Sequence, residues 1–286
     1  MPEMPEVEAL AQFLAGRTTG LSVARAELAA FAALKTFDPP LAAVLGRTVR
    51  GVGRRGKFIV IDVAPLVLVL HLARGGWVRW SDPLSTKLAR PGRGPLALRI
   101  GLSSGAGFDV TEAGTEKRLA VYVVRAPEEV DGIARLGPDP LDPAFDAPAL
   151  AAALAGHGGQ LKAALVSQAT VAGVGNAYSD EALHLARLSP FKLAARLTTD
   201  EAARLHAAVV GVLSDALARS AGRPAAELKD EKRSGMRVHG RTGLMCPECG
   251  DTVREVSFAT KSLQYCATCQ TAGKPLADRR LSRLLK

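Results

Sequence analysis

The hydrophobic positions give different parts of the chain different periodicities. In residues 3–15, Val7, Leu10 and Leu14 recur at the three- and four-residue spacing of an amphipathic helix. From about residue 20 to 125, short runs rich in Val, Ile and Leu are separated by Gly and Pro, a pattern that predicts β-strands. These runs are Arg54–Val63, Leu66–Leu72, Trp77–Ser81, Leu96–Leu102 and Leu119–Val124. We therefore expect an N-terminal helix followed by a β-sandwich.

The second half of the chain has a mainly helical pattern. Residues 126–148 are rich in proline and acidic residues, which predicts a linker. Residues 149–220 are rich in Ala and Leu with helical periodicity, so we expect several helices there. Residues 221–240 are polar and lack apolar periodicity, which predicts a loop. A cysteine-containing segment and a basic tail complete the chain.

The four cysteines, Cys246, Cys249, Cys266 and Cys269, form the pattern C-x2-C-x16-C-x2-C. Each C-x2-C pair can present two thiolates to one metal, and the spacer contains an alternating stretch that suits a β-hairpin. Four thiolates give the closed tetrahedral site of one structural zinc ion. The alternative interpretations are free thiols or two disulfides, but a disulfide framework more often spreads its cysteines along a secreted chain.

Composition and charge narrow the class of protein. The chain has 286 residues, 48% of them hydrophobic, which suits two or three compact units. It has no apolar run of roughly 18 residues, so we expect no membrane span. It has no recognisable signal peptide either, so we expect a cytoplasmic protein. The net charge of +9 favours a polyanion such as nucleic acid as a partner, although a basic soluble enzyme is the alternative.

A glycine turn interrupts the helical region at residues 168–181. Gly173 and Gly175 allow close approach of the backbone, and Asn176 is placed to cap the helix that follows. A glycine turn that leads into a helix N-terminus exposes N–H groups that suit a phosphate. Lys162, one helix upstream, would add a phosphate contact. The alternative is an ordinary corner between two helices.

The chain begins with a chemically distinctive residue. Met1 precedes Pro2, and a methionine before a small residue is normally removed, which would leave Pro2 with a secondary amine. An α-amine has a pKa of about 7.7–8.0, against about 10.4 for lysine, so a useful fraction is neutral near pH 7. A neutral amine can attack an electrophilic carbon and form an iminium, and the adjacent Glu3 can shuttle protons. The alternative is that these residues merely begin a helix.

Several motifs together resemble the formamidopyrimidine-DNA glycosylase / endonuclease VIII family of base-excision repair enzymes. They occur in the family's order along the whole chain, and the four cysteines with Gln270 complete the series. The other motifs are MPEMPEVE at residues 1–8, GRRGK at 53–57, His71-Leu72, LGPDPL at 136–141 and VAGVGNAYSDE at 171–181.

The resemblance implies an α+β fold with three domains. These are an N-terminal helix and β-sandwich (residues 1–130), a helix–two-turn–helix DNA-binding domain (131–225) and a zinc-ribbon hairpin with a basic tail (236–286). It implies a monomer that binds double-stranded DNA containing damaged bases or abasic sites in a basic cleft between domains. Such an enzyme would be associated with the nucleoid through its DNA.

The resemblance also implies a mechanism and its residues. The damaged nucleotide is flipped out of the helix, Pro2 attacks C1′, the base departs, and β-elimination cuts the strand. Glu3 would protonate the sugar or the leaving group, Lys57 would act as acid, base and phosphate partner, and Glu6 would support the pocket. His71, Lys162 and Asn176 match positions that hold phosphates, and such contacts position DNA without reading its sequence.

Four departures from the family pattern keep alternatives open. Arg74 stands where the family has the methionine that fills the gap left by the flipped base, and residues 111–118 lack the family's Arg-Phe-Gly intercalation segment. Lys261 stands where the zinc hairpin usually presents an arginine to phosphate and to δ-elimination, so it keeps the charge but loses the bidentate fork. The loop between Leu228 and Val238 is short, which weakens the case for 8-oxoguanine and leaves oxidised pyrimidines, formamidopyrimidines and abasic sites open.

Three functions remain to be separated. The first is an active glycosylase/lyase. The second is a non-catalytic or lyase-only paralogue that binds damaged or abasic DNA, which the changed wedge residues favour and the intact Pro2, Glu3 and Lys57 oppose. The third is a plain zinc-ribbon nucleic-acid-binding protein, which leaves the N-terminal motif unexplained.

Overall fold

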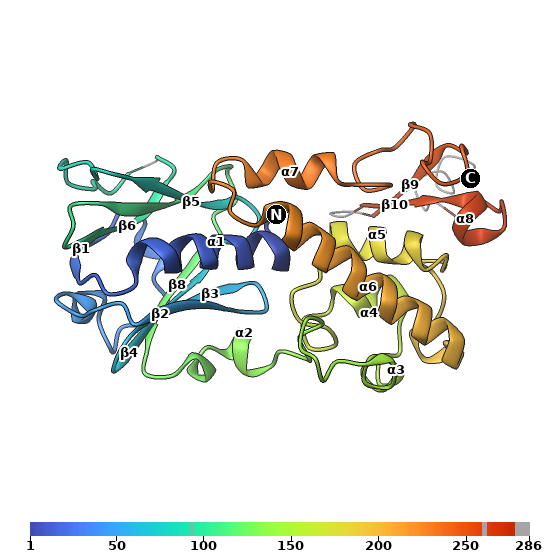
Figure 1. Ribbon diagram of the computed structural model, residues 1–286, viewed down its shortest axis with the longest axis horizontal. Coiled ribbons are helices and arrows are strands. Elements are labelled where there is room, and N and C mark those ends of the chain that lie inside the picture. The colour runs from blue at the N-terminus through green and yellow to red at the C-terminus, as the bar shows by residue number, and fades with distance from the viewer. Residues whose placement is uncertain (93, 259–261, 278–286) are drawn as a thin grey trace. The chain divides into compact units, whose positions relative to one another are not determined.

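A computed structural model describes residues 1–92, 94–258 and 262–277 of the chain. The chain forms two compact units (Figure 1). The first comprises Met1–Arg135 and Ser220–Lys229, and the second comprises Leu136–Arg219 and Asp230–Lys286. In the described part of the chain, no helix is both long and apolar enough to cross a membrane.

The first unit begins with helix α1 (Met4–Thr18). Pro5 lies in its first turn and costs no helical hydrogen bond, because the N–H groups of the first turn have no partner within the helix. Two four-stranded antiparallel sheets follow, with strand orders β1-β6-β7-β5 and β2-β3-β4-β8. The strands are β1 (Val23–Leu28), β2 (Gly51–Arg55), β3 (Phe58–Val63), β4 (Leu66–His71), β5 (Gly76–Ser81), β6 (Leu96–Leu102), β7 (Gly107–Glu112) and β8 (Ala120–Val124).

One hydrophobic core joins these elements. Leu10 of α1, Leu70 of one sheet and Phe108 of the other all belong to it and are at most 1% exposed. Because both sheets contribute their apolar faces to a single core, the unit is a β-sandwich with a helix packed on it. The chain returns here after the second unit: Leu228 is buried in the same core, and Trp77 Nε1 donates a hydrogen bond of 2.9 Å to the carbonyl of Ala225.

The second unit holds most of the helices and a small hairpin. Its helices are α3 (Ala147–Ala155), α4 (Leu161–Val166), α5 (Asn176–Leu185), α6 (Thr199–Ser220), α7 (Leu228–Ser234), which starts in the first unit, and α8 (Ala267–Thr271). Strands β9 (Val253–Ser257) and β10 (Ser262–Cys266) pair antiparallel, with Leu263 opposite Val256. Helix α5 packs against β10 and α8. The predicted α+β class is therefore confirmed.

Three predicted elements differ from the structure. The run Arg54–Val63 is two strands, β2 and β3, because Gly56 adopts a positive φ of 54° and allows a tight turn with Lys57. The predicted linker at residues 126–148 contains the short helix α2 (Asp131–Ala134) and 3-10 turn Pro127–Glu129. The predicted loop at 221–240 contains α7, whose sequence LKDEKRS has too few apolar residues to show a period. The remaining 3-10 turns are Phe31–Ala33, Leu41–Val44 and Ala194–Arg196.

Candidate active site and metal centre

The N-terminus is fixed by the first turn of α1. Glu3 and Glu6 are each only 2% exposed, although both are acidic. The Glu3 N–H donates a hydrogen bond of 2.8 Å to Oε2 of Glu6. This gives an acceptor to one of the N–H groups that the start of a helix would otherwise leave unpaired. Carboxylates at this end also face the positive end of the helix dipole. The result is a buried, ordered pair of carboxyl groups directly behind Pro2, which is itself buried.

Lys57 and His71 lie close together at one end of the second sheet. Lys57 occupies the β2–β3 turn and is 9% exposed, and the next residue, Phe58, pairs with His71 across β3 and β4. The Phe58 and His71 rings stack with centroids 4.6 Å apart. Burial, helped by the charge of Lys57, lowers the pKa of His71 to about 4. His71 is therefore neutral at pH 7 and acts as a hydrogen-bonding group rather than a cation.

The β2–β3 turn that carries Lys57 belongs to the same unit as α1, and an ion pair joins β2 to α1. Helix α1 packs against β2 and β3. Arg54, near the end of β2, donates from Nε to Oε2 of Glu8 in α1 at 2.9 Å, and the arginine side chain is only 7% exposed. The four predicted catalytic residues that the structure describes therefore lie in one unit: Pro2, Glu3 and Glu6 are at the start of α1, and Lys57 is in the β2–β3 turn.

Arg74 projects from a tight turn between β4 and β5. Its side chain is exposed, and the residue before it, Ala73, has a positive φ of 49°. The two residues after it must be glycine, because a Cβ at Gly75 or Gly76 would collide with the carbonyl oxygens of Ala113 or Leu72. The backbone therefore holds Arg74 at the surface in a fixed turn, at the position where the sequence departs from the family pattern.

The glycine turn of the second unit is held together from inside. The Lys162 ammonium donates to the carbonyl of Asn176 (2.9 Å), to Oγ of Ser179 (2.9 Å) and to Oδ1 of Asp180 (2.7 Å). Asp180 is 1% exposed, and its other oxygen lies 2.8 Å from Nδ1 of His239. Three acceptors within the chain occupy the three N–H groups of Lys162, which favours a role in holding the turn over the predicted phosphate contact.

Asn176 does not cap helix α5 as predicted. The N-cap residue is Gly175, with extended backbone, and Asn176 is the first helical residue. Its side-chain Nδ2 instead donates to the carbonyl of Ser262 in β10 at 2.9 Å. The prediction was wrong by one position, because the extended backbone that marks the N-cap falls at Gly175 and Asn176 is already helical. Asn176 therefore connects α5 to the hairpin.

We expect Lys162→Ala to lower the free energy of unfolding by about 3–5 kcal/mol, because it leaves the Asp180 carboxylate buried without its cation. Urea denaturation of the whole protein measures this. The matched control is Lys192→Ala, which breaks a more exposed pair with Glu201 and should cost less than about 1 kcal/mol. Equal, small effects from both substitutions would contradict this role for Lys162.

The four cysteines gather in the second unit. The sulfur atoms of Cys246 and Cys269 are 3.9 Å apart, and those of Cys249 and Cys266 are 3.4 Å apart. Four ligands at about 2.3 Å around one zinc ion place their sulfurs at comparable separations. In the protein alone, burial raises the pKa of Cys266 to about 11 and also raises that of Cys269. Thiolates at these positions therefore require a nearby cation, and the residues fit zinc.

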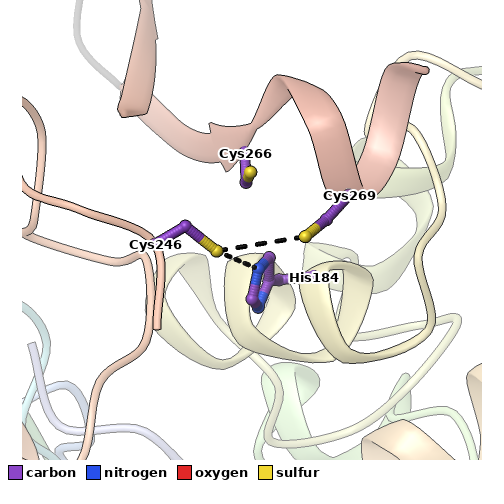
Figure 2. Close-up of side chains that lie close together, drawn as sticks. All are labelled: His184, Cys246, Cys266 and Cys269. Carbon is purple, nitrogen blue, oxygen red and sulfur yellow. Dashed lines mark hydrogen bonds between the residues drawn. The ribbon is translucent and has the colours of Figure 1, made fainter. Parts of the chain in front are cut away.

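A histidine that sequence reasoning did not connect with the metal lies beside this cluster. His184, near the C-terminal end of α5, is 1% exposed, and its Nε2 lies 3.3 Å from Sγ of Cys246 (Figure 2). The ligand atoms of His184, Cys246, Cys266 and Cys269 all lie within 4.8 Å of one another. No sequence motif connects this histidine with the cysteines, because 62 positions separate His184 from Cys246.

Comparison with known proteins agrees with this arrangement. Residues 1–111 match the formamidopyrimidine-DNA glycosylase N-terminal domain, residues 136–226 match its H2TH domain, and residues 243–272 match the zinc finger found in FPG and IleRS. The formamidopyrimidine-DNA glycosylase of Desulforamulus reducens is 32% identical over 284 residues, which cover 95% of this chain and 100% of that protein. The chain belongs to the formamidopyrimidine-DNA glycosylase family. The resemblance found in the sequence is thereby confirmed.

Other members of the formamidopyrimidine-DNA glycosylase family agree in sequence or fold. An uncharacterised formamidopyrimidine-DNA glycosylase-like protein of Mycobacterium tuberculosis is 62% identical over 151 residues, which cover 53% of this chain and 94% of that protein. The crystal structure of MutM (Fpg) from Thermus thermophilus superposes with a TM-score of 0.81 at 31% identity, over 96% of this chain and 100% of that one. A Lactococcus lactis Fpg structure with DNA containing an abasic site has a TM-score of 0.80 at 24% identity, over 94% of this chain and 99% of that one, which shows the shared fold.

Within this family assignment, His184 falls in the segment that matches the H2TH domain, whereas the cysteines fall in the zinc-finger segment. Gln270 makes a second connection of the same kind. Its Oε1 accepts from the N–H of Cys266 and its Nε2 donates to the carbonyl of Leu188, each at 3.0 Å. The predicted hairpin residue Lys261 lies outside the described residues.

Proposed function

We propose that this member of the formamidopyrimidine-DNA glycosylase family is a bifunctional DNA glycosylase and abasic-site lyase that acts through the amine of Pro2. The observation that carries the proposal is the buried Glu3–Glu6 pair behind Pro2, in the same unit as the buried Lys57. Burial of a carboxyl group is costly, so two buried carboxyl groups at a helix start favour a functional role for them. The Lactococcus lactis relative has been solved with DNA containing an abasic site and with DNA containing Fapy-dG, which supports damaged double-stranded DNA as the substrate class.

The first step joins protein and sugar. With Met1 removed, the lone pair of the Pro2 nitrogen attacks C1′ of a flipped nucleotide, and the bond from C1′ to the base breaks as the base takes up a proton. The sugar ring opens when its O4′ is protonated, which leaves an iminium between the Pro2 nitrogen and C1′. Glu3 supplies protons here, and Glu6, which fixes the Glu3 backbone, supports the pocket around the opened sugar.

The second step cuts the strand. Loss of a proton from C2′ drives out the 3′ phosphate by β-elimination, and water then hydrolyses the iminium and restores the Pro2 amine. Lys57 acts as acid, base and phosphate partner, and His71, Arg74 and Asn176 hold the DNA backbone. We further propose that Lys261 presents a single charge to phosphate. One structural zinc ion on the four cysteines would hold its hairpin, and the protein would act as a monomer on chromosomal DNA in the cytoplasm.

A second candidate function is binding of damaged or abasic DNA without base excision. Arg74 favours it, because a charged side chain replaces the apolar wedge of the family, and a cation binds phosphate or stacks on bases instead of filling a gap. Such a protein would retain abasic-site binding while failing to release bases. The two candidates therefore differ in base release, not in affinity.

Borohydride trapping tests the proposal. The wild-type protein, with Met1 shown by mass spectrometry to be absent, is mixed with an abasic-site duplex and with duplexes carrying oxidised purines, oxidised pyrimidines or formamidopyrimidines. We expect a reduced protein–DNA adduct and strand cleavage on the abasic duplex, and on at least one lesion duplex. An adduct on the abasic duplex alone would indicate a lyase without glycosylase activity. No adduct on any duplex would contradict the proposal.

The neutral state of His71 gives a separate prediction about DNA binding. Arg74→Gln should reduce the slope of log affinity against log salt by about 0.9, because one phosphate contact by a cation is lost. His71→Gln should weaken binding but leave the slope unchanged down to about pH 5, because His71 is uncharged there. Fluorescence anisotropy with an abasic-site duplex across a salt series measures both slopes. A smaller slope for the His71 variant would show that His71 binds DNA as a cation.

A further inference from the structure

The imidazole of His184 points from α5 toward the thiol cluster (Figure 2). Both partners of this contact are buried: His184 is 1% exposed and Cys246 is 2% exposed, and Nε2 lies 3.3 Å from Sγ. The distance suits a hydrogen bond from a ring N–H to sulfur. It also suits two ligands of one metal ion. The ring is therefore either a hydrogen-bond donor to Cys246 or a metal ligand, and the surroundings of its other nitrogen distinguish the two.

The other ring nitrogen argues for the hydrogen bond. Nδ1 of His184 is buried and has no hydrogen-bond partner among the described residues. A histidine that ligates a metal almost always donates its second N–H to a partner. If Nε2 ligated the metal, the proton would sit on Nδ1 and a buried donor would lack an acceptor, which is costly. With the proton on Nε2, Nδ1 carries only a lone pair and the N–H is satisfied by sulfur.

The ligand count leads to the same conclusion. The four sulfurs of Cys246, Cys249, Cys266 and Cys269 lie close enough to hold one zinc ion without a fifth group. Four thiolates around a divalent ion leave a formal charge of −2. Part of that charge is buried, because Cys246 and Cys266 are at most 2% exposed. An N–H donor aimed at one of these sulfurs offsets part of that charge.

We propose that His184 is a positioning residue that donates its Nε2–H to the zinc-bound thiolate of Cys246, and so fastens the zinc finger to the H2TH helix α5. Gln270 fastens the other cysteine pair in parallel, because it bonds both the Cys266 N–H and the Leu188 carbonyl just beyond α5. Each C-x2-C pair then has one side-chain bond to the H2TH segment. The metal affinity of the finger thereby depends on a residue outside the finger.

The test compares His184→Phe with His184→Gln in the full-length protein loaded with zinc or with Co²⁺. Competition against a chromogenic chelator should show a loss of zinc affinity of about 10- to 100-fold for the phenylalanine variant, the usual effect of losing such a partner. Glutamine keeps an N–H donor, so it should recover part of that loss. In the Co²⁺ protein, the sulfur-to-metal charge-transfer band should move to longer wavelength in the phenylalanine variant and return toward the wild-type position with glutamine.

The matched control is His206→Phe, at a half-buried histidine of α6 whose Nε2 lies 2.6 Å from the Phe145 carbonyl oxygen. It removes a histidine hydrogen bond in the same unit but away from the cysteines, so zinc affinity and the Co²⁺ band should not change. If His184→Phe fails to fold, the band position and zinc affinity of His184→Gln against wild type carry the test.

Two results would overturn the proposal. One is an unchanged zinc affinity and an unchanged Co²⁺ band in the His184 variants. The other is a wild-type Co²⁺ spectrum of three thiolates and one imidazole, together with zinc retention in Cys249→Ser, which would make His184 a ligand in place of Cys249.

Discussion

Pro2→Gly is expected to lower the yield of borohydride-trapped adduct and the rate of strand cleavage by roughly 100-fold or more, because the Schiff base of a primary amine can lose its proton and with it the positive charge that drives elimination. The substitution removes the secondary amine that forms the iminium. It also removes the pyrrolidine ring that fixes the backbone of the first residue. Because Glu3 and Glu6 remain in place at the start of α1, the fold and the affinity for abasic-site DNA should change little. Single-turnover trapping and anisotropy on the same duplex separate the two quantities.

The matched control is Pro5→Gly, the same chemical change three residues along the chain. Pro5 lies in the first turn of α1, and its loss should cost some stability but leave the amine of Pro2 unaltered. A second control blocks the amine without changing any side chain, by retaining an extra residue before Pro2. That protein should trap no adduct. Wild-type trapping by the extended protein would place the nucleophile elsewhere, and wild-type trapping by Pro2→Gly would contradict the requirement for a proline iminium.

Loss of the zinc ligands is expected to unfold the zinc finger as a unit. The buried apolar side chains of the segment form two small clusters, which together are too small to hold it folded. One is Val238 and Val253 beside Cys246 and Cys266, and the other is Val256, Leu263, Tyr265 and Ala267. Structural zinc contributes on the order of 10 kcal/mol to such segments. Cys246→Ser, or zinc removal by a strong chelator, should therefore abolish amide protection in β9 and β10 and reduce DNA affinity by at least about tenfold.

Hydrogen exchange read by mass spectrometry gives the measurement and its internal control. Peptides from β3 and β4 lie in the first unit, so their protection should not change when zinc is removed. Returning zinc to the chelated wild-type protein should restore protection in the hairpin, whereas Cys246→Ser should not recover. Full protection of β9 and β10 without metal would contradict the structural role of zinc.

The sequence predicted those elements whose signals are local. The spacing of Val7, Leu10 and Leu14 predicted α1, and these residues are buried in the core as expected. The tight turn at Gly56 was missed because the sequence pattern indicates a single run over residues 54–63, and only the backbone, with its positive φ at Gly56, shows that β2 ends at Arg55 and β3 begins at Phe58. Helix α7 was missed because it depends on the burial of Leu228 in the distant sandwich core, which no local period records.

In the candidate site, too, residues in local motifs could be predicted from the sequence, whereas contacts that depend on tertiary packing could not. Pro2, Glu3 and Lys57 were predicted from motifs, and the structure adds that Glu3 and Lys57 are buried within one unit. The bonding of Lys162 to Asp180 and the contact of His184 with Cys246 could not be predicted, because each depends on the packing of segments that are separate in the sequence. Lys162 and Asp180 lie on α4 and α5, whereas His184 of α5 meets a cysteine outside any helix. Tertiary packing decides whether a lysine binds phosphate or a neighbouring carboxylate.

The most direct test of the central claim is the identity of the residue that carries the trapped sugar. The wild-type protein is reduced with borohydride on an abasic-site duplex, digested with nuclease and protease, and the modified peptide is sequenced by mass spectrometry. The proposed mechanism predicts the sugar remnant on the N-terminal peptide, on the nitrogen of Pro2, with Met1 absent. A remnant on Lys57 or any other lysine, or an adduct on chains that still carry Met1, would contradict it.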